Sequence, residues 1–168
     1  TTKQMMGIAR SLAALLVAVG VLVSGAGGAT EVDLALVLAV DISRSMEPAE
    51  QELQREGFVE AFRSKDVHHA ILEGLLGRIA VVYIEWAGAS DQRIVVPWTV
   101  MEQPEDALGF AVRLAQSPIR SAGYTSLSGA IDFSARLLQA SDLAPARRVI
   151  DVSGDGANNQ GRPVSEAR

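Results

Sequence analysis

From residue 32 onward, apolar runs that suit buried strands alternate with segments of helical periodicity. Val32–Val40 is apolar at nearly every position, which is typical of a central parallel strand covered by helices on both faces. A helix is predicted from Pro48 to about Ser64, because proline suits the first helical turn. The apolar residues of this helix recur at helical spacing, so we expect its buried face to contain Leu53, Phe58, Val59 and Phe62.

Two strand-like runs follow, Arg78–Trp86 and Gln92–Val100. The connection between them is too short for a crossover helix, so we expect the two runs to pair as an antiparallel hairpin. Pro97 lacks the backbone donor that a central strand needs, which predicts that the second run lies at an edge of the sheet.

The second half of the chain predicts two helices and one more strand. The first helix begins at Pro104 and ends before Pro118, with an expected apolar stripe of Leu108, Ala111, Val112 and Ala115. The second presents small residues on one face, which consists of Leu127, Ala130, Ile131, Ser134 and Leu138. A short apolar strand, Arg147–Val152, follows. This order predicts an α/β fold with a Rossmann-like, doubly wound, mostly parallel sheet and one antiparallel edge strand.

The composition narrows the class of protein. A chain of 168 residues with 48% hydrophobic residues is long enough for one folded domain with a core. Its net charge of -5 argues against a nucleic-acid partner, since phosphate binding requires clustered Lys and Arg. The sequence contains no cysteine, which excludes disulfides and thiol chemistry. Neighbours on a helix point about 100° apart, so we expect His68 and His69 to be surface residues and not a shared metal site.

Residues 1–29 have the layout of a secretory signal peptide, in which Lys3 and Arg10 precede an apolar core and small residues lead up to Ala29. An uncleaved membrane anchor is the alternative, but the strongly apolar part, Leu12–Val23, is short for a bilayer span. We therefore expect a mature domain of residues 30–168 that is periplasmic or secreted and has no membrane span.

Polar side chains stand where the predicted strands end. Asp41, Ser43 and Ser45 follow the first strand, Asp155 follows the last, and Thr125 begins a helix between them. Ligands of open α/β sheets bind outside the carboxyl ends of the strands, so the two carboxylates share one site if their strands are neighbours. The three polar residues after the first strand can converge on one point as that strand curls into a turn.

These five side chains supply oxygen atoms alone, from two carboxylates and three hydroxyls. Hard cations prefer oxygen ligands, which predicts a Mg²⁺ site, with Mn²⁺ or Ca²⁺ as alternative ions. Because hydroxyls do not cancel charge, the ion would stay electropositive and could accept an acidic side chain from another molecule. Taken singly, the residues also have simpler interpretations: Asp41, Ser45 and Thr125 suit helix caps, and the glycine-bracketed Asp155 suits a turn.

The sequence Asp41-Ile-Ser43-Arg-Ser45 resembles the Asp-x-Ser-x-Ser signature of von Willebrand factor type A domains. Thr125 in GYTSLSGAI is similar to the threonine loop of that family, and Asp155 in SGDG to its third-loop aspartate. The resemblance implies a metal-ion-dependent adhesion site. In such a site Ser43, Ser45 and Thr125 bind Mg²⁺ through their hydroxyls, Asp41 and Asp155 lie close by, often through water, and an Asp or Glu of a partner protein completes the ligands.

The hairpin further resembles a branch of secreted proteobacterial proteins of this family with no assigned function. Complete domains of the family have a six-stranded sheet, whereas four strands can be identified here, so we expect a chain that is incomplete at its C-terminus. The strand Arg147–Val152 would then form an exposed, apolar edge of the sheet.

Together these features predict a non-enzymatic, metal-dependent protein-binding module. The alternative is a Mg²⁺-dependent phosphoryl hydrolase that uses Asp41 as nucleophile or base. Against it, the motif loops contain no His, Lys or second acid to serve as general acid, and Arg44 is the one nearby candidate for stabilising a phosphoryl group. A third interpretation is a module that works beside a partner ATPase, as in metal-chelatase complexes. Those complexes are cytoplasmic, which conflicts with the export signal.

Overall fold

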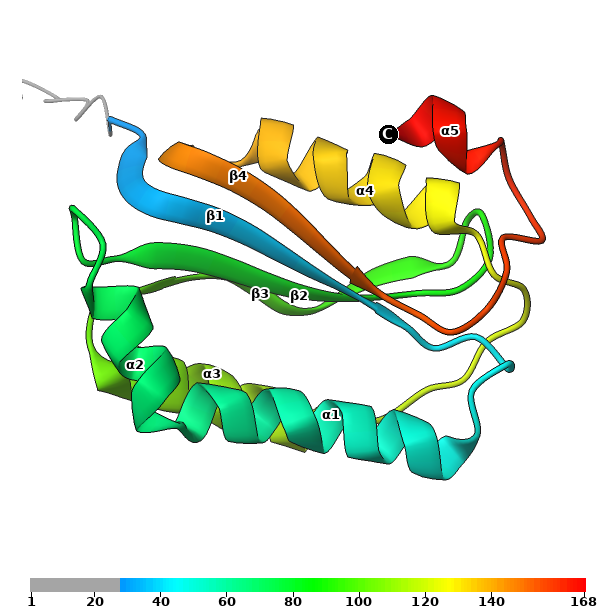
Figure 1. Cartoon of the computed structure of the whole chain (residues 1–168), viewed down its shortest axis with the longest axis horizontal. Coiled ribbons are helices and arrows are strands. Elements are labelled where there is room, and N and C mark those ends of the chain that lie inside the picture. Colours follow the sequence, from blue (N-terminus) through cyan, green and yellow to red (C-terminus); the bar gives the residue numbers. More distant parts are fainter. Residues whose placement is uncertain (1–27) are drawn as a thin grey trace, which may run out of the picture.

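The computed structural model describes residues 28–168, which form a four-stranded sheet with helices on both faces. The predicted signal peptide lies outside the described residues apart from its last two positions. Figure 1 shows three layers, with α1, α2 and α3 below the sheet and α4 and α5 above it. In chain order the elements are β1 (Thr30–Asp41), α1 (Pro48–Arg63), α2 (Lys65–Leu72), β2 (Ile79–Trp86), β3 (Gln92–Met101), α3 (Pro104–Gln116), α4 (Leu127–Ala140), β4 (Leu143–Ser153) and α5 (Val164–Ala167).

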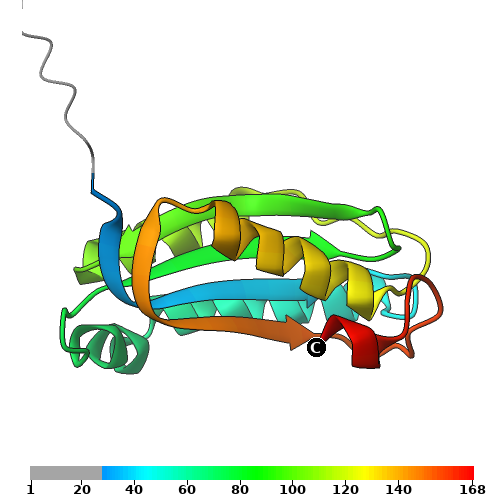
Figure 2. The same cartoon turned by 90° about the horizontal axis from the view of Figure 1, so that it is seen from above.

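The strands lie in the order β3-β2-β1-β4. β1 is central and parallel to both of its neighbours, so that Leu38 lies opposite Tyr83 of β2 and Asp151 of β4. β3 pairs antiparallel with β2 at the edge of the sheet, as Pro97 predicted, and the view from above in Figure 2 shows the strands side by side. The α/β class with a mostly parallel, Rossmann-like sheet and one antiparallel edge strand is therefore confirmed.

Alternate residues of β1 face two separate cores. Leu38 and Val40 pack in the cluster beneath the sheet, together with residues of α1 and α3. Val37 and Ala39 pack in the cluster above it, against α4. The side chains of α4 that are buried include Ala130 and Ser134, which belong to the small-residue face that the sequence predicted. Burial on both faces explains why β1 is apolar along almost its whole length.

The predicted buried face of α1 was wrong at one position. Leu53 is 70% exposed, whereas Arg55 is 6% exposed and forms an ion pair with Glu85, which is 1% exposed. Val59 and Phe62 are buried as expected. Leu53 precedes Phe62 by nine residues, which places the two side chains on opposite sides of the helix, whereas Arg55 lies one turn before Val59 on the buried face. Leu53 therefore did not belong to the helical spacing of the other three residues.

The predicted stripe of α3 was wrong at three of its four positions, because Leu108 and Val112 are 41% and 46% exposed, Ala115 is exposed too, and only Ala111 is buried. Phe110 and Leu114 are fully buried instead, so the face toward the sheet is rotated relative to the one expected from the sequence. The helix itself spans the predicted range and ends before Pro118. Apolar residues occur on both sides of this helix, and its periodicity therefore did not select the correct face.

One of the two expected surface histidines is buried. His68 is 8% exposed, and its Nε2 lies 2.7 Å from the backbone oxygen of Phe62 in α1, while His69 is exposed. His68 therefore joins α2 to the end of α1 and is not available as a free surface group.

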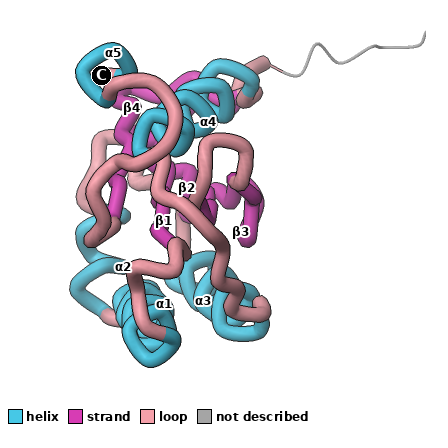
Figure 3. The backbone as a smooth tube through the Cα atoms, turned by 90° about the vertical axis from the view of Figure 1, so that its right-hand side faces the viewer, coloured by secondary structure: helices cyan, strands magenta, loops and turns pink. Residues whose placement is uncertain are grey.

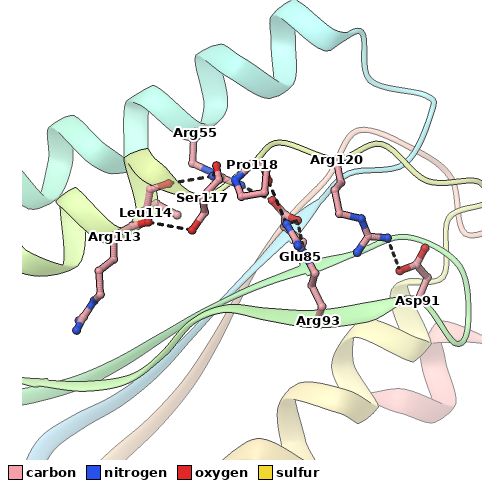
Figure 4. A network of polar contacts seen from close by, with 9 residues as sticks. All are labelled: Arg55, Glu85, Asp91, Arg93, Arg113, Leu114, Ser117, Pro118 and Arg120. Atoms are coloured by element: carbon pink, nitrogen blue, oxygen red, sulfur yellow. Dashed lines mark hydrogen bonds and ion pairs between the residues drawn. The ribbon is translucent and has the colours of Figure 1, made fainter.

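A buried polar network connects the helical layer to the sheet, as Figure 4 shows. Glu85 of β2 accepts hydrogen bonds from Arg55 of α1 and from Arg93 of β3. Arg55 also donates to the backbone oxygens of Leu114 and Ser117, each at 3.0 Å. The network thereby holds the end of α3, where the chain turns back toward the carboxyl edge of the sheet.

Within residues 28–168, no helix is both long enough and apolar enough to cross a bilayer.

Candidate metal centre

The predicted site residues lie in loops at one end of the sheet. β1 and β4 are neighbours and parallel, so the residues that follow them emerge at the same edge. Figure 3 views the molecule from this end, where the connections between strands and helices gather. The segment that leads into α4 reaches the same place, because the Ala122 N–H donates to the Ile42 oxygen at 2.9 Å.

The first loop is the connection between β1 and α1, residues 42–47. Its start folds so that the polar side chains of Asp41, Ser43 and Ser45 approach one point. Asp41 Oδ1 accepts a hydrogen bond from the Ser43 N–H at 2.7 Å, and the hydroxyls of Ser43 and Ser45 lie 2.7 Å apart. The intervening residues point elsewhere, since Ile42 is 4% exposed and packs inward while Arg44 is exposed. The convergence of every second residue that the sequence predicted is therefore present in the structure.

The third loop, residues 154–163 between β4 and α5, makes a direct contact with the first loop. Ser45 Oγ donates to Asp155 Oδ1 at 3.1 Å, although the two residues are 110 positions apart. A Cβ atom placed on Gly156 would lie 3.1 Å from both Ser45 Oγ and Thr125 Oγ1. The hydroxyls of the first and second loops therefore face the same small space beside Asp155, and all five predicted residues are brought to one location.

The second carboxylate oxygen of Asp41, Oδ2, also lies at this location. Asp41 is fully buried, and its Oδ2 has no hydrogen-bond partner among the described residues. A Cβ atom on Gly154 would lie 2.8 Å from that oxygen, so the glycine makes room for it. A buried oxygen of this kind is costly unless a donor or a cation satisfies it. The residues present therefore fit a divalent cation.

The electrostatics of Asp41 agree with that fit. Burial raises the pKa of its carboxyl, the hydrogen bonds from Ser43 lower this pKa, and the nearby charge of Asp155 raises it. Burial dominates, so the negative charge of Asp41 is disfavoured in the protein alone. A cation beside the carboxylate would offset both the desolvation and the repulsion from Asp155.

The simpler interpretation of these residues as helix caps is wrong. The N-cap of α1 is Glu47, which forms a capping box with Glu50. The N-cap of α4 is Ser126, whose Oγ accepts from the Gly129 N–H at 3.2 Å. Capping therefore does not explain Asp41, Ser45 or Thr125.

The second loop, residues 117–126 between α3 and α4, is held by two asparagines that the sequence analysis did not identify. Asn159 Oδ1 accepts from the Thr125 N–H, and Asn158 Oδ1 accepts from the Leu127 N–H, each at 2.8 Å. The Asn159 N–H in turn donates to the Thr125 oxygen at 2.9 Å. In the sequence the Asn-Asn pair looks like ordinary loop composition, and its proximity to Asp155 was the one available signal.

Three of the five side chains at the candidate centre are hydroxyls, those of Ser43, Ser45 and Thr125. No cluster of three or more His, Cys, Asp or Glu side chains able to hold a metal occurs in residues 28–168. The hydroxyls of Ser43, Ser45 and Thr125 are the further oxygen atoms that lie beside the two carboxylates.

A family model with the description "Protein of unknown function (DUF1194)" matches residues 31–168. The comparison with curated proteins gives no match.

Several solved structures resemble the chain. Proximal thread matrix protein 1 from the mussel byssus matches with a TM-score of 0.55 and 14% identity, over 82% of this chain and 34% of that chain. The vWF domain of the type V pili tip protein Mfa5 from Porphyromonas gingivalis matches with a TM-score of 0.46 and 13% identity, over 76% of this chain and 39% of that chain. The conserved hypothetical protein BatB from Bacteroides thetaiotaomicron matches with a TM-score of 0.38 and 21% identity, over 61% of this chain and 45% of that chain.

This chain thus spans about a third of the mussel protein chain that it matches, and the likeness to that protein shows a shared fold.

Proposed function

The chain belongs to the family described as "Protein of unknown function (DUF1194)", and from the geometry of its loops we propose that it is a metal-dependent protein-binding module. In this proposal Ser43, Ser45 and Thr125 bind Mg²⁺ through their hydroxyls, with Mn²⁺ or Ca²⁺ as alternatives. Asp41 and Asp155 support the ion directly or through water. An exposed Asp or Glu of a partner protein completes the ligands.

The convergence of three loops that are distant in sequence carries the proposal. Ser43, Ser45 and Asp155 form a chain of hydrogen-bonded oxygens, and the free oxygen of Asp41 is buried next to them. Hard cations take such oxygen ligands. Three of the five ligands are neutral, so the bound ion would keep enough positive charge to attract a carboxylate from outside.

The proposed place of action is outside the cytoplasm, in the periplasm or in the surroundings of the cell. The layout of residues 1–29 supports this, with its charged start, apolar core and small-residue end.

Thermal unfolding with and without Mg²⁺ tests the metal. At a concentration of one hundred times its dissociation constant, Mg²⁺ should stabilise the domain by about 2.7 kcal/mol, which raises Tm by roughly 5–10 °C, and EDTA should reverse this. Ser43→Ala and the isosteric Thr125→Val should abolish the shift. Asp142→Ala, which removes an exposed carboxylate at the opposite end of the sheet, should retain it. Unchanged Tm in Mg²⁺ for the wild-type chain would sink the proposal.

Affinity capture from a periplasmic extract, with the wild-type and variant chains as bait, tests partner binding. Captured proteins should be present in Mg²⁺, absent in EDTA and absent with Ser43→Ala. A generic phosphoester such as p-nitrophenyl phosphate is included in the comparison. If the wild-type chain hydrolyses the phosphoester in Mg²⁺ and Asp41→Asn does not, the protein is a phosphoryl hydrolase and the proposal of a binding module is wrong.

A further inference from the structure

A cleft of about 580 Å³ opens beside the proposed metal centre. It lies where the first loop, the β2–β3 turn, the segment before α4 and the third loop meet, and its lining includes Arg44, Gly88, Ser90, Asp91, Tyr124 and Gln160. Arg44 stands between two of the proposed ligands in sequence, and Tyr124 directly precedes a third. A peptide segment that places a carboxylate on the metal would therefore bring its next residues over this cleft.

The walls of the cleft are held together by contacts within the protein. Gln160 Oε1 accepts a hydrogen bond from the Ala89 N–H at 2.6 Å, which joins the third loop to the β2–β3 turn. A Cβ atom on Gly88 would lie 2.7 Å from the same Gln160 oxygen and 3.3 Å from the Gly123 oxygen, so the segments approach closely at the floor. The cleft is therefore formed before any partner arrives.

Tyr124 is held in a costly conformation at the rim. Its φ of 65° lies in the left-handed region, which residues other than glycine rarely adopt. The side chain is nevertheless 66% exposed, so packing against the rest of the domain does not account for a tyrosine there. An exposed aromatic ring offers a surface on which a bound segment can pack. Strain of this kind is concentrated at functional sites.

The charges around the cleft favour an acidic ligand. Arg44 is exposed and makes no ion pair within the described part of the chain, whereas the lining residue Asp91 is paired with Arg120 at 3.5 Å. The lining contains one arginine and one aspartate, and because Asp91 is already paired with Arg120, Arg44 is the lining charge that has no ion-pair partner among the described residues. The free guanidinium of Arg44 is therefore the group that an incoming side chain would meet.

We propose that this cleft, called here the Arg44 cleft, binds a second acidic side chain of the partner. The recognised segment is then diacidic: one carboxylate docks on the metal, and another within two residues of it pairs with Arg44 while the backbone packs on Tyr124. This inference rests on the proposed function and specifies the partner that the metal centre selects.

Fluorescence anisotropy with labelled, end-blocked heptapeptides tests the proposal. Each peptide has a central Asp in a Gly/Ser background. The single-acid peptide has no other charge, and the other peptides add either a second Asp or a Lys at one of the two positions on either side of the central residue. The wild-type chain in Mg²⁺ should bind the best diacidic peptide about three- to five-fold more tightly than the single-acid peptide, the range expected for a partly exposed ion pair. The preference should shrink at high salt.

Charge reversal separates the cleft from general electrostatics. Arg44→Glu should reverse the preference, so that the Lys peptide binds more tightly than the diacidic one. Lys65→Glu changes the net charge equally, on an exposed residue of α2, and should preserve the diacidic preference. Tyr124→Gly should raise Tm, because the strain is relieved, and should weaken binding of the diacidic peptide several-fold.

The outcomes distinguish the two proposals. Equal affinity of wild type for single-acid and diacidic peptides, with binding still lost in EDTA, would overturn the Arg44 cleft and leave the metal module intact. A diacidic preference that survives Arg44→Glu would also overturn it. Absence of Mg²⁺-dependent binding for every peptide would overturn both proposals.

Discussion

At the scale of single residues, the candidate centre depends on positions where a larger side chain would not fit. Gly154 leaves room for the free Oδ2 of Asp41, and Gly156 leaves room for the hydroxyls of Ser45 and Thr125. Neither glycine has a positive φ, so the requirement is space and not backbone freedom. The Gly-Asp-Gly sequence is therefore explained by close approach between loops, with Asp155 held between two small residues.

Gly154→Ala tests this requirement. The new Cβ would lie 2.8 Å from Asp41 Oδ2 and 3.0 Å from Trp86, so the third loop must shift. We expect a loss of about 1–3 kcal/mol in the free energy of unfolding and a fall of about tenfold in Mg²⁺ affinity. Urea unfolding and calorimetric titration measure the two effects. Gly109→Ala is the control, because nothing lies within 4 Å of its Cβ in α3, and it should stabilise the chain by about 0.5–1 kcal/mol.

Asn159→Ala tests the support of the second loop. The substitution removes the acceptor of the Thr125 N–H, so the hydroxyl of Thr125 loses its fixed position. Mg²⁺ affinity should fall about tenfold, as for other residues that orient a metal ligand. Asn158→Ala removes the acceptor of the Leu127 N–H and should cost comparable stability with a smaller loss of affinity. Equal losses of affinity in both variants would contradict a specific role for Asn159.

At the scale of elements, the polar network around Glu85 connects α1, the end of α3 and the hairpin (Figure 4). Arg93 donates to Glu85 and also to the Pro118 oxygen at 3.1 Å, just where the chain leaves α3 for the second loop. The segment that carries Thr125 is therefore anchored at its start by this network and at its end by Asn159.

Glu85→Ala tests the network. It would leave Arg55 buried without its carboxylate, and breaking a buried pair in this way costs about 3–5 kcal/mol. The urea midpoint should fall accordingly. Glu60→Ala removes a carboxylate from the exposed pair with Arg63 and should change stability by less than about 1 kcal/mol. Matching midpoints for the two variants would show that the buried pair is not important for stability.

At the scale of the whole molecule, the two edges of the sheet differ. β3 forms one edge and contains Pro97, which cannot donate to an added strand. β4 is the other outer strand of the described sheet, but it is longer than the predicted Arg147–Val152 and its edge is not purely apolar. Its exposed Arg147 and Arg148 place positive charge on that edge, and charges of this kind oppose edge-to-edge pairing.

The double substitution Arg147→Val and Arg148→Val should therefore increase self-association. Light scattering at rising protein concentration should show larger particles than for wild type, with a strand-rich circular dichroism signal. Arg136→Val changes an exposed arginine on α4, away from the edges of the sheet, and should leave the chain as disperse as wild type. A disperse double variant would show that the two arginines do not protect the edge.

The sequence by itself determined the four strands, the helices α1, α3 and α4, the fold class and the end of the sheet at which the site lies. The all-apolar run of β1, the short connection of the hairpin and Pro97 in β3 are local features, and local periodicity is enough to identify them. Asp41 and Asp155 were placed correctly because the carboxyl ends of parallel strands share an edge.

The tertiary structure alone decided the rotation of the helices and the support of the loops. The face of α1 that meets the sheet includes Arg55, which pairs with Glu85, and Thr125 is positioned by Asn159, which lies 34 residues away. The Arg44 cleft likewise exists because four separate segments meet. Each of these features is a contact between residues that are distant in sequence. Such a contact depends on how the elements pack, and therefore it produces no periodic pattern of residue types along the chain.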